Sequence, residues 1–154
     1  MLFERLLKEA DEHNIRVYEN PLSSKIKGLY GDGIVWLNRR LPTSIEKSCV
    51  LAEELGHYHT SSGDILNQKD IRNRKQEKRA RNWAYEKLVP LEKFIEAYEA
   101  GVCNRYELAE FLDVTEEFLE QAIVHYKEKH GLFIQVGKHL VYFEPFGVFH
   151  LFNE

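Results

Sequence analysis

The hydrophobic positions at the start of this 154-residue chain change from a helical to an alternating period. In residues 2–13 apolar side chains recur every three or four positions between acids and bases, which predicts an amphipathic helix. Residues 15–18 then alternate as in a short strand, and residues 25–30 and 34–38 flank Gly31-Asp32-Gly33, a hairpin signal. We therefore expect one helix followed by a small β-sheet.

A long helix is predicted next, over about residues 43–59. Thr43 followed three residues later by Glu46 forms a capping box, which marks where the helix starts. Ser61-Ser62-Gly63 then predicts its end. The apolar residues of the helix form a buried stripe: Ile45, Cys49, Val50 and Leu55.

A basic stretch from Lys69 to Lys87 also has a helical pattern, with an apolar side that includes Trp83. A charge run of this kind is usually a solvated helix face, and the alternative is a surface for an acidic partner or nucleic acid. Pro90 then breaks the run and begins a helix over about 91–99.

Residues 104–130 predict two helices separated by Asp113-Val114-Thr115, with apolar positions spaced like a helix-turn-helix. This spacing invites a DNA-binding interpretation. The segment carries seven acidic side chains, however, which Lys127 and Lys129 do not offset, and phosphates would repel it. We expect a structural or partner-docking module rather than direct DNA binding. Alternating runs after it predict a small β-meander: 132–136, 139–144 and 148–152.

Composition narrows the class of protein. The net charge of −4 gives no general case for binding to nucleic acid or a membrane, and no apolar run approaches the length of a transmembrane helix. The N-terminus is amphipathic and charged, unlike a signal peptide. Two cysteines, Cys49 and Cys103, then suggest reduced thiols, so a soluble cytoplasmic protein is expected.

The candidate chemistry lies in Leu51–Thr60, within the long helix. Glu53 and His57 are four residues apart and point from the same face, with Glu54 beside them. This is the arrangement of a helix-borne metal site with a general base, although the usual form is His-Glu-x-x-His and Glu53 stands in place of the first histidine. The alternative is an amphipathic helix with solvated glutamates and a hydrogen-bonded histidine.

Two further residues bear on this site. Glu77 is placed to supply a third ligand from an antiparallel helix, with the small Ala80 one turn later allowing close approach. His59 points elsewhere in an unbroken helix. If the helix frays at Tyr58, His59 could replace the missing imidazole; otherwise it is a surface histidine favoured by the helix dipole.

These residues resemble the ImmA/IrrE family of metallopeptidases found in phages, prophages and mobile elements. The resemblance covers about residues 15–90 well and the rest loosely. It is carried by four segments: Leu51–His57, Lys75–Ala84, Leu88–Pro90 and the hairpin of Gly28–Leu41.

The resemblance implies zinc dependence and, by analogy with some members, action on a helix-turn-helix repressor. It implies that Glu54 is the general base and that His57 and Glu77 are metal ligands, with Glu53 where the first histidine stands. We therefore expect an α+β fold: a zincin-like helical metallopeptidase core with a small N-terminal β-sheet in residues 1–100, then helix-turn-helix-like helices and a β-meander in residues 101–154.

Two functions remain open at this stage. The sequence favours a metal-dependent endopeptidase that hydrolyses a protein with a metal-activated water, with Zn²⁺ as the expected metal and another divalent metal, or none, as alternatives. The rival is a catalytically inactive protein that regulates a repressor by protein–protein binding, motivated by Glu53 and by the acidic C-terminal half. The hairpin strand beside the helix either holds an extended peptide or only covers the helix.

Overall fold

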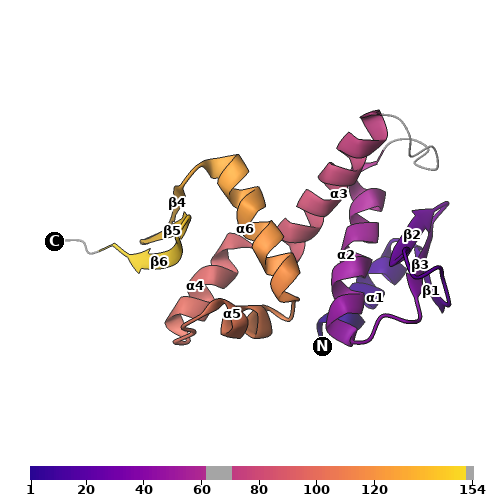
Figure 1. The fold of residues 1–154 in the computed structure, drawn as a ribbon, viewed down its shortest axis with the longest axis horizontal. Coiled ribbons are helices and arrows are strands. Elements are labelled where there is room, and N and C mark those ends of the chain that lie inside the picture. The colour runs from indigo at the N-terminus through magenta and orange to yellow at the C-terminus, as the bar shows by residue number, and fades with distance from the viewer. Residues whose placement is uncertain (62–70, 152–154) are drawn as a thin grey trace. The chain divides into compact units, whose positions relative to one another are not determined.

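The computed structural model describes residues 1–61 and 71–151, the side chains of 71–73 excepted. Within these ranges it contains six helices and two three-stranded sheets, so the predicted α+β class is confirmed (Figure 1). The contacts divide the chain into two compact units, Met1–Ala84 and Tyr85–Glu154. The division lies earlier than the sequence-based boundary at residue 100 because α4 (Leu91–Glu99) packs on the helix and strands that follow it.

The N-terminal unit consists of a small sheet with two helices packed on it and the first part of a third. Its elements are α1 (Leu2–Glu12), β1 (Arg16–Asn20), β2 (Gly28–Gly31), β3 (Ile34–Asn38), α2 (Ser44–Thr60) and α3 (Ile71–Leu88) as far as Ala84. The strand order is β1-β3-β2, with β1 parallel and β2 antiparallel to the central β3. The predicted hairpin is present, and Asp32 and Gly33 both have the positive φ that a two-residue turn requires (49° and 73°).

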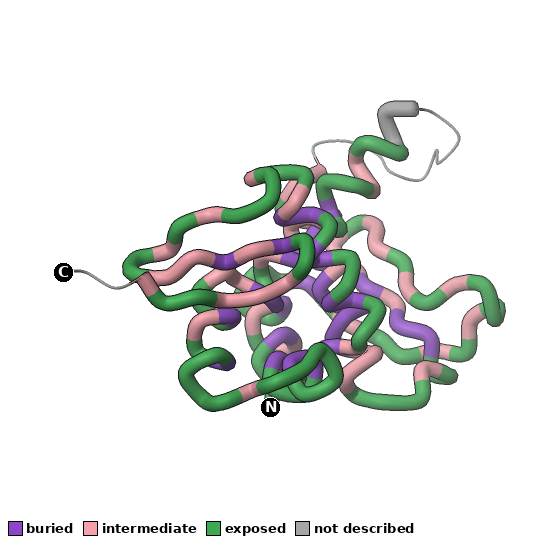
Figure 2. Tube along the Cα trace, turned by 60° about the vertical axis from the view of Figure 1, so that its left-hand side comes forward, coloured by how far each residue is buried: buried purple, intermediate pink, exposed green. Residues whose placement is uncertain are grey.

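The core of this unit lies between β3 and α2. Val35 and Leu37 of β3 and Leu51 and Leu55 of α2 are all fully buried. On α2 the buried residues form an almost continuous run from Ser48 to His57, so most of this part of the helix is covered; Figure 2 colours buried residues purple. Helix α2, which bears the candidate site, is thus held in position by its packing on the sheet.

Both ends of α2 follow from local sequence. The Thr43 side chain accepts a hydrogen bond from the Glu46 backbone N–H at 3.1 Å, so the predicted N-cap is confirmed. At the other end Ser61 is the C-cap, and its N–H donates to the His57 carbonyl. The other predicted end residues, 62 and 63, and the first residue of the basic stretch, 69, lie outside the described residues.

Helices α2 and α3 approach each other closely at a glycine. A Cβ atom placed on Gly56 would lie 2.3 Å from the Ala80 carbonyl oxygen and 3.0 Å from the Ala80 Cα. The expectation that a small residue lets the two helices approach is therefore confirmed, and the glycine on the facing helix is as necessary as Ala80.

The C-terminal unit continues from the last turn of α3 through three helices and a meander. Its elements are α4, α5 (Arg105–Leu112), α6 (Glu116–His130), β4 (Phe133–Val136), β5 (His139–Phe143) and β6 (Phe146–His150). Asp113 adopts the left-handed conformation at the end of α5, and the Thr115 side chain caps α6 by accepting from the Phe118 N–H. The apolar spacing that predicted two helices and a short turn is confirmed here.

The sheet of this unit is antiparallel in the order β4-β5-β6, which confirms the meander. Its last strand begins at Phe146 rather than at residue 148. The prediction was wrong there because the turn is shorter: Phe143 pairs with Phe146, leaving only Glu144 and Pro145 between the strands. Residue 152, the predicted end of this strand, lies outside the described residues.

Two further sequence predictions can be compared with the structure. Neither cysteine forms a disulfide; Cys49 is buried and Cys103 is exposed. Among the described residues, no helix combines the length and apolar character needed to cross a membrane.

Replacement of Gly56 by alanine tests the close approach of α2 and α3. We expect a loss of about 1–3 kcal/mol in the free energy of unfolding, because the added methyl group meets rigid backbone rather than a movable side chain. Denaturant unfolding of both proteins measures it. Gly147→Ala is the matched control, since its Cβ would meet only the Phe149 ring at 3.3 Å. Equal losses in the two variants would contradict this packing.

Candidate functional site

A pocket of about 750 Å³ opens beside α2 in the N-terminal unit. One wall is formed by β2 and the segment before it, and the other by one face each of α2 and α3. The lining residues that bear on the chemistry below are Lys27, Gly28, Tyr30, Glu53, Glu54, His57, Glu77 and Arg81. All four predicted site residues of the two helices are therefore in one pocket.

Helix α2 presents three of these side chains to the pocket. Glu54 and His57 are buried, with 9% and 5% of their surface exposed, whereas Glu53 is half-buried. The glycine at the start of β2 lets the strand pass close to them: a Cβ on Gly28 would lie 3.2 Å from Glu54 Oε2 and 2.6 Å from a Val50 methyl carbon.

Helix α3 contributes Glu77, as the sequence predicts. Its Oε1 lies 3.3 Å from His57 Nε2, which places the carboxylate and the imidazole within hydrogen-bond distance. The other ring nitrogen, Nδ1, is buried and has no hydrogen-bond partner among the described residues. The group that faces Nε2 therefore sets the orientation of the ring.

The electrostatics of the pocket are dominated by buried carboxyl groups. Burial raises the pKa of Glu54 to about 7, against the lowering effect of His57, and also raises the pKa of Glu53, against that of Arg81. The hydrogen bond with His57 lowers the pKa of Glu77. Burial by itself would lower the pKa of His57, but the Glu77 hydrogen bond and the surrounding carboxylates together raise it. Lys25, Lys27 and Arg81 also line the pocket, so it is burial that keeps the pKa values of Glu53 and Glu54 raised.

A buried asparagine holds the segment that leads into β2. The Asn38 amide donates to the carbonyls of Leu22, Ser23 and Ile26, and its oxygen accepts from the N–H groups of Leu22 and Arg40. Residues 25 and 26 of this segment line the pocket. This network fixes the approach of the chain to the strand that forms the pocket wall.

Strand β2 is an edge strand of the three-stranded sheet. It pairs with β3 on one side, and all four of its residues line the pocket. An edge strand in this position can receive an extended peptide by strand addition, with main-chain hydrogen bonds providing the affinity. The geometry thus permits the peptide-holding interpretation of the hairpin.

Sequence reasoning did not single out two polar residues of the pocket. Arg81 belongs to the basic stretch that the sequence predicts to be a solvated face. It is exposed, and it also lines the pocket and stabilises the Glu53 carboxylate. Its position four residues after Glu77 puts both on the same face of α3, and this spacing could have found it. Tyr30 has no such signal, because it reaches the pocket only through the pairing of β2 with β3.

His59 is not in the pocket. The suggestion that it could replace the missing imidazole required the helix to fray at Tyr58, whereas α2 stays helical through Thr60. Two residues beyond His57, it therefore projects from another face, where its ring stacks on Trp83 with centroids 4.5 Å apart.

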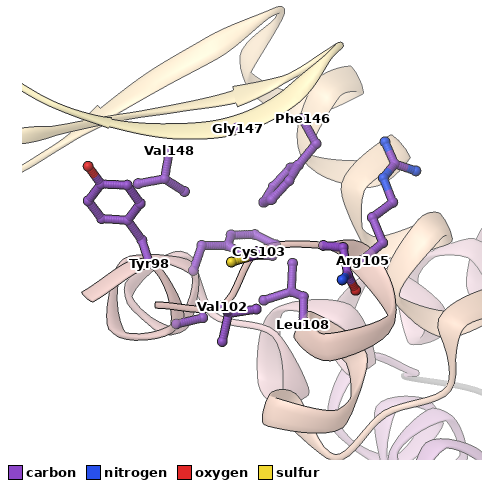
Figure 3. Close-up of a pocket in the computed structure, with 11 residues that line it drawn as sticks. Tyr98, Val102, Cys103, Arg105, Leu108, Phe146, Gly147 and Val148 are labelled. Atoms are coloured by element: carbon purple, nitrogen blue, oxygen red, sulfur yellow. The ribbon is translucent and has the colours of Figure 1, made fainter. Parts of the chain in front are cut away.

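A second cavity lies in the C-terminal unit. It has a volume of about 250 Å³ and is lined by apolar residues together with Asn104, Arg105, Cys103 and Tyr98 (Figure 3). No carboxylate or imidazole lines it among the described residues. It lacks the carboxylate and imidazole groups that line the pocket beside α2, so that pocket is the candidate site.

The comparison with protein families agrees with this geometry. A family model described as the IrrE N-terminal-like domain, Peptidase_M78, matches residues 10–124, which include every residue of the pocket. The chain belongs to this family. The comparison with curated proteins gave no match. Membership in Peptidase_M78, with the pocket described above, points to a metallopeptidase-like function and implies a metal.

The donors of the Peptidase_M78 pocket fit a divalent cation. Glu53, His57 and Glu77 offer oxygen and nitrogen ligands, and a bound cation would offset the cost of ionising the buried Glu54 carboxyl group. In this structure His57 and Glu77 already lie side by side. Glu53 lines the same pocket, but its carboxylate oxygens and the donor atoms of His57 and Glu77 do not all lie within 4.8 Å of one another. The set is richer in carboxylate than the usual zinc site, which favours harder metals.

The raised pKa of Glu54 predicts a pH-dependent stability of the metal-free protein. The folded-state pKa of about 7 exceeds the unfolded value of 4.5, so this contribution is fully present below pH 4.5 and is lost as the pH rises through 7. At pH 8 Glu54→Gln should therefore be more stable than wild type, by on the order of 3 kcal/mol. At pH 5 the two proteins should nearly coincide.

Thermal unfolding in chelator at both pH values measures this difference. Glu46→Gln, in the first turn of the same helix, controls for the loss of one carboxylate. A stability difference between Glu54→Gln and wild type that is the same at pH 5 and pH 8 would show that Glu54 is not buried as described.

Proposed function

We propose that the chain is a metal-dependent endopeptidase of phage or mobile-element type that hydrolyses a protein substrate in the cytoplasm. One observation carries the proposal: Glu53, Glu54, His57 and Glu77 line a single pocket whose other wall is an edge strand. A peptide held along that strand would pass in front of a base and three metal donors. Family membership is consistent with it, as are two cysteines that form no disulfide.

Each residue has a distinct role in the proposed reaction. Glu53, His57 and Glu77 would hold a divalent cation, Zn²⁺ in the first instance. When bound, such a cation acts as a Lewis acid and lowers the pKa of water. Glu54 takes the proton from the attacking water and later delivers it to the leaving amine, a task that suits a carboxyl group with a pKa near neutrality.

The rest of the pocket positions the substrate. The free edge of β2 offers backbone N–H and C=O groups to an extended peptide, and the Tyr30 hydroxyl and Arg81 guanidinium are donors for its carbonyl groups. The substrate class that the family resemblance suggests is a helix-turn-helix repressor. The acidic C-terminal helices α5 and α6 are a candidate docking surface for such a basic protein.

The proposal predicts different outcomes for two substitutions in the pocket. Glu54→Gln should retain the metal and lose cleavage, because the amide keeps the shape but cannot accept the proton, whereas His57→Ala should lose both. Metal content is measured on protein purified without a histidine tag, and cleavage on a co-expressed repressor. Glu46→Gln should keep wild-type metal content and cleavage. If Glu54→Gln cleaves as fast as wild type, the proposed base is wrong.

A second candidate function rests on Glu53. A carboxylate in place of the first histidine weakens the case for zinc, and a pocket that has lost its metal could still bind a peptide along β2. In this alternative the protein regulates a repressor by binding alone. Capture of the repressor that is indifferent to chelator and to His57→Ala, with no cleavage, would favour it over the enzyme.

A further inference from the structure

Three side chains with metal-binding atoms meet outside the pocket, where α1 and α2 end. Glu9 and His13 are one turn apart at the end of α1, where His13 is the C-cap, and His59 lies in the last turn of α2. One donor atom from each lies within 4.8 Å of the other two. The packing of α1 on α2 thus brings His59 next to two residues that precede it by 46 and 50 positions in the sequence.

The donor set has a definite metal preference. Two imidazoles and one carboxylate suit borderline metals such as Zn²⁺, Co²⁺, Ni²⁺ and Cu²⁺ rather than Mg²⁺ or Ca²⁺. Ligands at 2.0–2.2 Å from a tetrahedral metal lie about 3.4 Å from one another. The three ligand atoms already lie within 4.8 Å of one another, so only small shifts would bring them to this spacing.

Aromatic contacts hold the two imidazoles in place. The His59 ring stacks on Trp83 at an interplanar angle of 16°, and the His13 ring stands at 90° to it with centroids 5.0 Å apart. The Tyr58 ring contacts both imidazoles, with its centroid 5.4 Å from that of His13 and 4.9 Å from that of His59. These contacts restrict the two imidazole rings before any metal binds. The loss of side-chain entropy on metal binding is therefore smaller.

The backbone adds a favourable field for a cation. His13 and His59 lie at the carbonyl ends of their helices, where each helix carries a partial negative charge. The last turn of α1 contains no basic residue to neutralise it. Two helix ends and a carboxylate thus surround the imidazoles.

We propose that Glu9, His13 and His59 form a second metal site, specific for a borderline divalent transition metal and separate from the pocket beside α2. None of the three residues lines that pocket. Water or a donor from a bound partner completes the coordination. The bound metal joins the end of α1 to the end of α2, and so stabilises the helix that carries His57 by the free energy of binding.

Zinc titration of the His57→Ala protein, purified without a tag and freed of metal, tests the proposal. This substitution removes a ligand of the pocket, so the remaining binding reports on the second site. We expect one equivalent of Zn²⁺ bound with submillimolar affinity, and an unfolding temperature that rises with zinc concentration. Wild type should bind one equivalent more if the pocket also binds zinc, so a failure of either site can be recognised separately.

Three further substitutions identify the ligands in the His57→Ala background. His13→Asn, Glu9→Gln and His59→Phe, which keeps a ring to stack on Trp83, should each weaken zinc binding by about a hundredfold, since even partners of metal ligands contribute 10–100-fold. His150→Ala, an exposed histidine of β6, should leave the affinity unchanged. Circular dichroism verifies folding. The proposal is overturned if His57→Ala binds no zinc, or only at millimolar concentration, or if the three substitutions leave its affinity intact.

Discussion

The close approach of α2 and α3 at Gly56 is the contact on which the candidate site depends. The Ala80 carbonyl lies where the glycine has no Cβ, so the two helix backbones nearly touch at this point. His57 directly follows the glycine, and Glu77 lies one turn before Ala80. The same contact that packs the helices therefore brings the Glu77 carboxylate to 3.3 Å from the His57 imidazole. A substitution that separates the two helices at Gly56 would therefore also separate Glu77 from His57.

Charge balance is the second constraint on the pocket. Three glutamates and one histidine meet in a partly dehydrated space, and the protein offers Arg81 and nearby lysines as the cationic groups that line it. The result is a carboxyl group, that of Glu54, with a pKa of about 7. Such a group is costly to ionise without a cation, which is why the pocket is better understood as a site for a divalent metal than as a solvated acidic face.

Local sequence was sufficient where the structure follows local rules. The Thr43 cap, the Asp32-Gly33 turn and the shared face of Glu53 and His57 each depend on residues within a few positions of one another. The partnership of His57 with Glu77 could be anticipated from the spacing of Glu77 and Ala80 on a second helix, together with the family resemblance.

What the sequence could not provide is pairing across long separations. No local sequence pattern indicates that β1 pairs with β3 in parallel, or that Tyr30 lines the pocket. His59 shows the same limit: its spacing from His57 excluded the pocket in an intact helix, but only the fold reveals that it meets His13 and Trp83. The division of the chain within α3 likewise depends on how α4 packs, not on composition.

We propose that the pocket beside α2 binds a metal despite the glutamate at position 53. Anomalous diffraction at the zinc absorption edge, from crystals grown with Zn²⁺, tests this most directly. We expect a peak about 2.0–2.2 Å from His57 Nε2 and from carboxylate oxygens of Glu53 and Glu77. Crystals that show zinc elsewhere on the protein, with His57 Nε2 still paired to Glu77 and no peak between them, would contradict it.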